Sequence, residues 1–229
     1  MTSSVTEPAP AGANPRRLVL WRHGRTAWNV SGRAQGTTDV PLDHVGREQA
    51  RDAATRLASL RPRIIWSSTL SRALDTAAEL GALTGLEVHR DARLQEIDTG
   101  ARQGLTLDEV RERFPDTWRA FQAGEELPRA PGGETEPEVA ERVSAAMRDA
   151  TEALGPAEIG VLVSHGVAIR VGLCRFLGLP HGHWHLLAGV SNCAWVVVEE
   201  WRRGWRLVDY NAGSLPEPVL SDDTLSAGR

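Results

Sequence analysis

Short apolar runs alternate with longer amphipathic stretches along this chain. The apolar runs are bounded by polar residues and glycine, which is typical of buried strands. They cover residues 17–21, 64–66 and 159–163. The amphipathic stretches carry apolar residues at intervals of three and four, as one face of a helix does. They cover residues 46–60, 71–83, 134–154 and 167–177. The alternation predicts an α/β fold, a three-layer α/β/α sandwich whose central sheet is mostly parallel.

Weaker patterns complete the prediction. Residues 87–89 suggest a brief strand, and residues 194–199 and 205–210 suggest a late pair of strands near the edge of the sheet. The polar segment from 106 to 123 predicts two short helices broken near Pro115. We expect one domain over residues 16–212, with flexible tails at 1–15 and 213–229.

Composition and charge narrow the class of protein. The 229 residues are 41% hydrophobic, enough for a packed core, and the net charge of −4 gives no reason to expect nucleic acid as a partner. No apolar run approaches the ~20 residues that span a membrane, and the first residues lack the apolar core of a secretory signal. We therefore expect a cytoplasmic protein. Cys174 and Cys193 lie in apolar stretches and are expected to be small buried hydrophobic residues.

Polar, chemically capable residues follow three of the predicted strands. The strand ends are followed by Arg22-His23-Gly24, by Ser67-Ser68 and then Arg72, and by Ser164-His165-Gly166. The carboxyl ends of parallel strands meet at one edge of a sheet, so two arginines and two histidines are expected to converge there. Arginines bind phosphate in a bidentate manner, and the helix N-terminus after His165 would add backbone donors. These residues together predict a phosphate site.

A simpler alternative is that polar residues at strand ends only cap helices. Ser67 and Ser68 fit that role, and we expect one of them to cap the following helix. Capping does not explain why a His-Gly pair occurs at two equivalent places, which favours a site.

The same segments resemble the histidine phosphatase superfamily, also called phosphoglycerate mutase-like. The resemblance covers residues 16–211 and rests on four ordered blocks. They are residues 22–50, 67–77, 94–100 and 163–166, which read RHGRTAWN through GREQA, SSTLSRALDTA, LQEIDTG and VSHG.

The resemblance implies a role for each residue of the predicted phosphate site. His23 would attack phosphorus and become phosphohistidine. Arg22, Arg72 and His165 would surround the phosphoryl oxygens and stabilise the charge of the transition state. A nucleophilic histidine must be neutral, with an acceptor on its other ring nitrogen, and a carbonyl near Gly24 would supply that acceptor.

The resemblance also implies an acid–base residue and a binding surface. Glu96 would protonate the leaving oxygen and then deprotonate the attacking water. Asn29, Gln35 and Gly36 would line the phosphate pocket. Neither a metal nor a cofactor is implied, and the expected partner is a small phosphorylated metabolite. A homodimer is implied by the resemblance alone.

Three functions fit the pattern: a phosphomonoesterase of the histidine acid phosphatase type, a cofactor-dependent phosphoglycerate mutase, and a non-catalytic phosphate-binding member. The chain contains every residue that the implied chemistry needs, which disfavours the non-catalytic function. These residues are Arg22, His23, Arg72, Glu96 and His165. Glu96 and His165 are 69 positions apart, and similar mutases carry a longer insertion there that excludes water. The short segment 100–106 favours a phosphatase.

The C-terminal part narrows the expectation further. Residues 189–195 and 205–212 resemble a group within the superfamily, the glucosyl-3-phosphoglycerate phosphatases, which suggests glucosyl-3-phosphoglycerate as substrate. Arg25 departs from the superfamily pattern, and we expect it to be solvated rather than to favour a more anionic substrate. The histidines of the His181-Gly-His183-Trp-His185 segment are expected at a loop or rim rather than on a metal.

Overall fold

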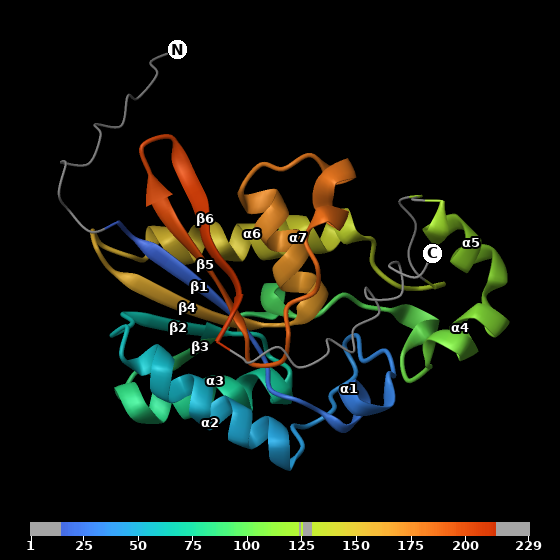
Figure 1. Ribbon diagram of the computed structural model, residues 1–229, viewed down its shortest axis with the longest axis horizontal. Coiled ribbons are helices and arrows are strands. Elements are labelled where there is room, and N and C mark those ends of the chain that lie inside the picture. Colours follow the sequence, from blue (N-terminus) through green and yellow to red (C-terminus); the bar gives the residue numbers. More distant parts are fainter. Residues whose placement is uncertain (1–14, 124, 126–129, 214–229) are drawn as a thin grey trace.

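A six-stranded mixed sheet forms the centre of the computed structural model, which describes residues 15–123, 125 and 130–213 (Figure 1). The strand order is β3-β2-β4-β1-β5-β6. The pairs β1–β4, β2–β4 and β2–β3 are parallel, and β1–β5 and β5–β6 are antiparallel. The strands are β1 (Arg17–Arg22), β2 (Ile64–Ser67), β3 (Val88–Arg90), β4 (Ile159–Ser164), β5 (Trp195–Trp201) and β6 (Gly204–Ala212).

Helices cover both faces of the sheet, as Figure 1 shows. Helices α2 (His44–Ala58) and α3 (Ser71–Thr84) pack on one face, where Trp21, Ile65 and Val163 are buried. Helices α6 (Glu136–Glu152) and α7 (Gly166–Phe176) pack on the other face, over Leu18, Leu20 and Leu162. Burial of alternate strand residues on the two faces produces two cores, one on each side of the sheet. The predicted three-layer α/β/α sandwich is confirmed.

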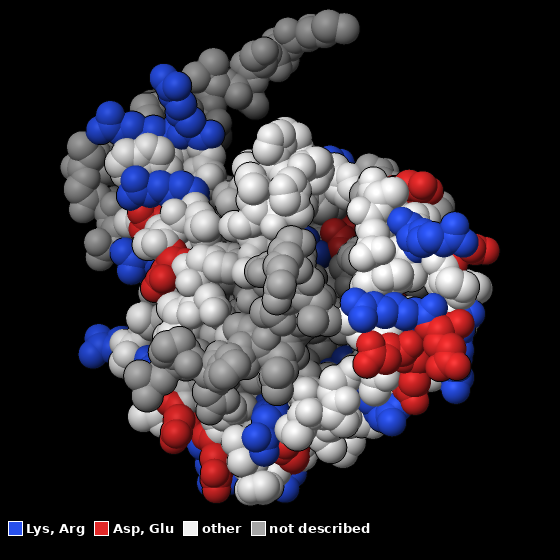
Figure 2. Space-filling view, turned by 45° about the vertical axis from the view of Figure 1, so that its right-hand side comes forward, with Lys and Arg blue, Asp and Glu red and all other residues white. Residues whose placement is uncertain are grey.

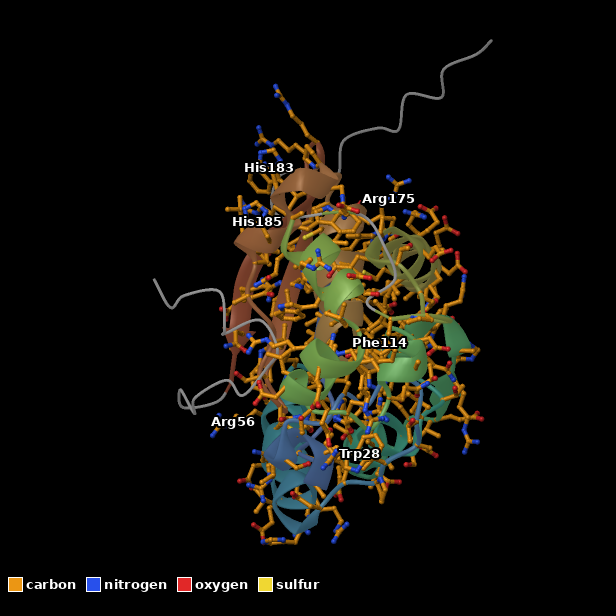
Figure 3. All side chains as sticks on the ribbon, turned by 90° about the vertical axis from the view of Figure 1, so that its right-hand side faces the viewer. Trp28, Arg56, Phe114, Arg175, His183 and His185 are labelled. Atoms are coloured by element: carbon orange, nitrogen blue, oxygen red, sulfur yellow. The ribbon has the colours of Figure 1, made fainter. Side chains whose placement is uncertain are left out.

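The remaining elements lie on the edge of the sandwich and around its loops. They are α1 (Ala27–Ser31), η1 (Ala92–Leu94), η2 (Gly100–Arg102), α4 (Leu107–Arg113), α5 (Pro115–Gln122) and η3 (His181–Leu186). The predicted break near Pro115 separates α4 from α5, and Figure 3 shows Phe114 at their junction. Helix α1 was not predicted because it is five residues long and buries none of them, so it has no hydrophobic period.

Helices α2 and α6 each begin two residues away from the predicted start, and capping residues explain both differences. Helix α2 begins at His44 rather than 46 because the Asp43 carboxylate caps it, accepting from the Gly46 amide at 2.7 Å. Helix α6 begins at Glu136 rather than 134 because Thr135 and Glu138 form a capping box. Almost all of the two predicted tails lies outside the described residues.

The register brings the polar strand ends together. Arg22 at the end of β1 is opposite Ser164 at the end of β4, and Ser67 at the end of β2 is opposite Val163. His23 and His165 follow immediately, and their ring centroids are 5.0 Å apart. The sheet therefore places both histidines at one edge, as the sequence predicts.

The outer surface and the buried cysteines can be compared with the composition. Figure 2 shows acidic and basic side chains interspersed on the face that it presents. Within the described part of the chain, no helix has both the length and the apolar character needed to cross a membrane. Cys174 and Cys193 are free and buried as expected, and burial raises the pKa of the Cys174 thiol to about 11.

At Gly24 the backbone after β1 passes close to the backbone of helix α2. A Cβ added at Gly24 would lie 2.3 Å from the carbonyl oxygen of Gly46. Gly24→Ala should therefore destabilise the fold by about 2–3 kcal/mol through overpacking, a fall in Tm of roughly 5–10 °C for a domain of this size. Calorimetry tests this, with Gly182→Ala as the control, because a Cβ at Gly182 meets nothing within 4 Å. Equal Tm values for the two variants would refute the close-approach argument.

Candidate active site

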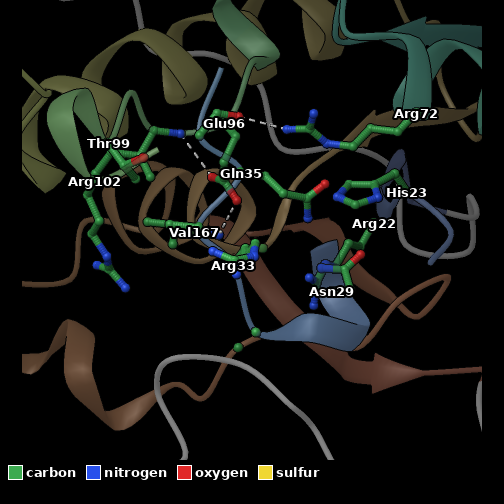
Figure 4. A pocket seen from close by; sticks show the side chains of 16 residues that line it. Arg22, His23, Asn29, Arg33, Gln35, Arg72, Glu96, Thr99, Arg102 and Val167 are labelled. Atoms are coloured by element: carbon green, nitrogen blue, oxygen red, sulfur yellow. Dashed lines mark hydrogen bonds between the residues drawn. The ribbon is translucent and has the colours of Figure 1, made fainter. Parts of the chain in front are cut away.

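A pocket opens at the edge where the strand ends converge (Figure 4). It contains about 780 Å³ of empty space, which includes solvent at its open mouth. It contains all of the predicted site residues except His165, which is fully buried behind it. The lining residues are Arg22, His23, Asn29, Gly32, Arg33, Ala34, Gln35, Gly36, Arg72, Glu96, Ile97, Thr99, Arg102, Gly166, Val167 and Gly189.

The His23 ring is oriented by its own backbone neighbour. Its Nδ1 is 2.7 Å from the carbonyl oxygen of Gly24. A carbonyl only accepts, so Nδ1 carries the proton and Nε2 keeps the lone pair that a nucleophile needs. The His23 carbonyl accepts from the side-chain amide of Asn192 at 3.1 Å, which fixes the backbone. The predicted acceptor near Gly24 is thus present.

Burial keeps both site histidines neutral. The pKa of His23 lies well below its ordinary value of 6.5, first because the ring is desolvated and then because Arg72 and Arg22 are close. Desolvation also lowers the pKa of His165 well below 6.5, with Arg72, His23 and Arg22 adding to the effect. A neutral His23 at physiological pH is ready to attack an electrophile.

Arg72 is a fully buried cation held in a fixed position. Its two terminal nitrogens donate to the carbonyl oxygens of Thr38 and Gly36, both at 2.8 Å. Burial lowers its pKa to about 10, which still leaves it charged near neutral pH. Gly36 therefore contributes a carbonyl that holds Arg72, in addition to lining the pocket. On the other side of His23, Arg22 donates to the carbonyl of Val190 at 2.5 Å.

His165 is locked between Arg72 and Ser68. The Nε–H of Arg72 donates to His165 Nδ1 at 3.2 Å, so in the neutral ring Nε2 carries the proton and donates to Ser68 Oγ at 2.8 Å. This corrects the expectation that Ser67 or Ser68 is a helix cap. The N-cap position of α3 is Leu70, without a side-chain cap, and Ser67 Oγ donates to the Ser68 carbonyl. Instead, the Ser68 hydroxyl accepts the hydrogen bond from His165.

Asn29 and Gln35 are held by Thr26, which caps helix α1. Asn29 Oδ1 accepts from the Thr26 amide at 3.0 Å, and Gln35 Oε1 accepts from the Thr26 hydroxyl at 2.9 Å. With both side-chain oxygens occupied by Thr26, the amide NH₂ groups are the ends available to an anion. Both residues line the pocket as predicted.

Glu96 contacts the N-terminus of helix α7. Its Oε1 accepts from the Ala168 amide at 2.9 Å. Its Oε2 accepts from the Val167 amide at 3.2 Å, as Figure 4 shows. A carboxylate is favoured there by the helix dipole and the unsatisfied amides. The sequence predicted that these amides would serve the phosphate. In the structure the amides of Val167 and Ala168 bond to Glu96 instead, and only Gly166 and Val167 of this turn line the pocket.

Among the pocket residues with polar or charged side chains, sequence reasoning missed three: Arg33, Thr99 and Arg102. Arg33 is fixed by the Gly104 carbonyl at 2.6 Å and by Glu109 at 3.0 Å. Arg102 is 3% exposed although arginine is rarely buried. Arg33 stands inside a block that carried the superfamily resemblance, but neither arginine follows a strand.

Other residues singled out in the sequence lie away from the pocket chemistry. Arg25 pairs with Asp43 at 2.8 Å and does not line the pocket, so it is half-buried in an ion pair rather than simply solvated. Figure 3 places His183 and His185 at the opposite end of the molecule from Trp28. Among the described residues, no group of three or more histidines, cysteines or carboxylates is arranged to hold a metal ion.

The two depressed histidines predict a pH-dependent stability. The unfolded chain binds protons near pH 6.5, whereas folded His23 and His165 do not until much lower pH. Stability should therefore fall as the pH drops below about 6.5, by roughly 1.4 kcal/mol per pH unit for each histidine. Urea unfolding between about pH 5 and 7.5 measures this slope. His23→Gln should remove about half of it, and a flat profile would contradict the burial argument.

Comparison with known proteins agrees with this geometry. Residues 18–213 match the family model of the histidine phosphatase superfamily (branch 1). A glucosyl-3-phosphoglycerate phosphatase of Mycolicibacterium vanbaalenii is 39% identical over 217 residues, which cover 87% of this chain and 96% of the relative. A probable phosphoglycerate mutase of Salmonella paratyphi C is 36% identical over 164 residues, covering 72% of this chain and 76% of the relative.

A solved structure is also similar. The mycobacterial glucosyl-3-phosphoglycerate phosphatase in complex with VO3 has a TM-score of 0.81 and 36% identity, and the match covers 86% of this chain and all of that one. The chain therefore belongs to the histidine phosphatase superfamily. Within it, the phosphatase interpretation fits these relatives better than the mutase alternative, and the chain is a phosphoric monoester hydrolase.

Proposed function

We propose that this enzyme hydrolyses glucosyl-3-phosphoglycerate to glucosylglycerate and phosphate through a phosphohistidine on His23. The observation that carries the proposal is the buried His23 ring, whose Nδ1 is bonded to the Gly24 carbonyl while the ring lies between Arg22 and Arg72. The similarity to glucosyl-3-phosphoglycerate phosphatases over most of both chains supports the substrate.

In the first step, the lone pair on His23 Nε2 attacks phosphorus and the bond from phosphorus to the ester oxygen breaks. Arg22 and Arg72 balance the charge on the phosphoryl oxygens, and the NH₂ groups of Asn29 and Gln35 bind them. Glu96 in its acid form gives its proton to the departing oxygen.

In the second step, water attacks the phosphohistidine. Glu96, now a carboxylate, takes the proton from that water, and the bond from nitrogen to phosphorus breaks to release inorganic phosphate. The amides of Val167 and Ala168 donate to the two carboxylate oxygens of Glu96 and hold its side chain in position for this step. His165, held by Ser68 and Arg72, keeps Arg72 in place beside the phosphoryl group.

Purified enzyme in the presence of chelator should be offered glucosyl-3-phosphoglycerate, 3-phosphoglycerate and other phosphomonoesters. We expect release of free phosphate, fastest from the glucosylated substrate. Isomerisation of phosphoglycerate without phosphate release would favour the mutase instead. Failure to hydrolyse the glucosylated ester alone would remove the substrate and leave the phosphatase. A homodimer and a cytoplasmic location stay predictions, and sedimentation velocity tests the first.

A further inference from the structure

The pocket has a wall on the far side of Glu96 that the phosphoryl chemistry does not use. This wall is formed by Ile97, Thr99 and Arg102, all of which follow Glu96 in sequence and line the pocket. Figure 4 shows Arg102 on the opposite side of the pocket from His23 and Arg22. The inference drawn from this wall rests on the proposed function.

In-line displacement decides which part of the substrate meets this wall. The leaving oxygen departs from the face of phosphorus opposite the attacking nitrogen of His23. Glu96 must contact that oxygen to protonate it, so the alcohol portion of the ester extends from Glu96 into the wall beyond. Thr99 and Arg102 are therefore placed to contact the alcohol portion rather than the phosphoryl group.

The guanidinium of Arg102 indicates which chemical group the alcohol portion of the substrate carries. Its side chain is 3% exposed and stands at the C-terminal end of η2 (Gly100–Arg102). The Arg102 amide donates to Thr99 and the Leu105 amide donates to Arg102, both at 3.0 Å, so the backbone on both sides of the side chain is fixed. A guanidinium is charged at every physiological pH and recognises a carboxylate with a planar pair of donors.

We propose that Arg102 binds the carboxylate of the substrate and makes the enzyme selective for phosphate esters of hydroxy acids. Arg33 lines the same pocket and donates to Glu109 and to the Gly104 carbonyl, which braces the loop that follows Arg102. Selectivity for the carboxylate then comes from the charge of Arg102 on the leaving-group side of the pocket. Arg22 and Arg72 lie on the phosphoryl side.

The test compares two substrates that differ at one group. 3-Phosphoglycerate carries a carboxylate where glycerol 3-phosphate carries a hydroxymethyl group. Arg102→Gln should lower kcat/KM for 3-phosphoglycerate and for its glucosylated form by about 10- to 100-fold, the loss of a charged pair. Glycerol 3-phosphate should change less than about 3-fold. Arg102→Lys should recover part of the selectivity, and Arg175→Gln, an exposed arginine paired with Glu141, is the matched control.

Each outcome separates this inference from the proposed function. Equal losses on both substrates, or a wild-type enzyme that does not discriminate between them, would overturn the role of Arg102. The wild-type enzyme could fail to hydrolyse the glucosylated ester and still prefer 3-phosphoglycerate in an Arg102-dependent manner. That result would overturn only the proposed substrate.

Discussion

Replacing His23 with alanine is expected to lower kcat by at least about 10³-fold on every phosphomonoester, because the covalent route is lost with the nucleophile. The fold should persist. The His23 amide donates to the Ser164 carbonyl and its carbonyl accepts from Asn192, so the backbone at this position does not depend on the ring. Steady-state phosphate release measures the loss, and circular dichroism checks the fold.

Rescue of His23→Ala by added imidazole distinguishes a nucleophilic role of His23 from a purely structural role. The substitution leaves a space for a ring between Arg22 and Arg72, and added imidazole can enter it and attack phosphorus. We expect imidazole to restore part of the activity and N-methylimidazole, whose blocked nitrogen cannot donate to the Gly24 carbonyl, to restore less. Activity in His23→Ala close to the wild-type level, without imidazole, would disprove the nucleophile assignment.

Glu96→Gln is the substitution with the second largest expected effect. Glutamine keeps the shape and one acceptor oxygen for the amides at the start of α7, but it neither gives nor takes a proton. Esters of ordinary alcohols should lose about 10²–10⁴-fold in kcat, the usual contribution of general acid–base catalysis.

A substrate with an activated leaving group separates the two roles of Glu96. p-Nitrophenolate leaves without a proton, so formation of phosphohistidine from p-nitrophenyl phosphate should be nearly normal in Glu96→Gln. Hydrolysis of the intermediate still needs a base and should be slow. Stopped-flow absorbance should then show a burst of one nitrophenolate per enzyme. Equal losses on activated and ordinary esters, without a burst, would assign Glu96 a structural role only.

The sequence predicted the parts of this site that strand geometry determines. Arg22, His23 and His165 each follow a buried apolar run, and parallel strands must deliver their ends to one edge. Glu96, by contrast, lies in a loop between η1 and η2, where no hydrophobic period exists. Its role was available only from the resemblance, and its position on the N-terminus of α7 only from the structure.

Side-chain partners explain the remaining differences. The sequence favours a helix cap for one of Ser67 and Ser68 because local signals describe only near neighbours, whereas His165, the partner of Ser68, is 97 positions away. Arg102 was missed because a buried arginine looks in sequence like any surface arginine. Arg25 was expected in solvent, but the N-cap residue Asp43 accepts from it. Each of these contacts depends on tertiary packing rather than on spacing along the chain.

The proposed mechanism requires that the phosphoryl group passes through Nε2 of His23. A single-turnover experiment with enzyme in excess, quenched in alkali where phosphohistidine survives and followed by peptide mass mapping, tests it directly. We expect a phosphoryl group on the peptide that contains His23, which forms before free phosphate and decays as phosphate appears. Release of phosphate with no modified peptide, or with the phosphoryl group on another residue, would contradict it.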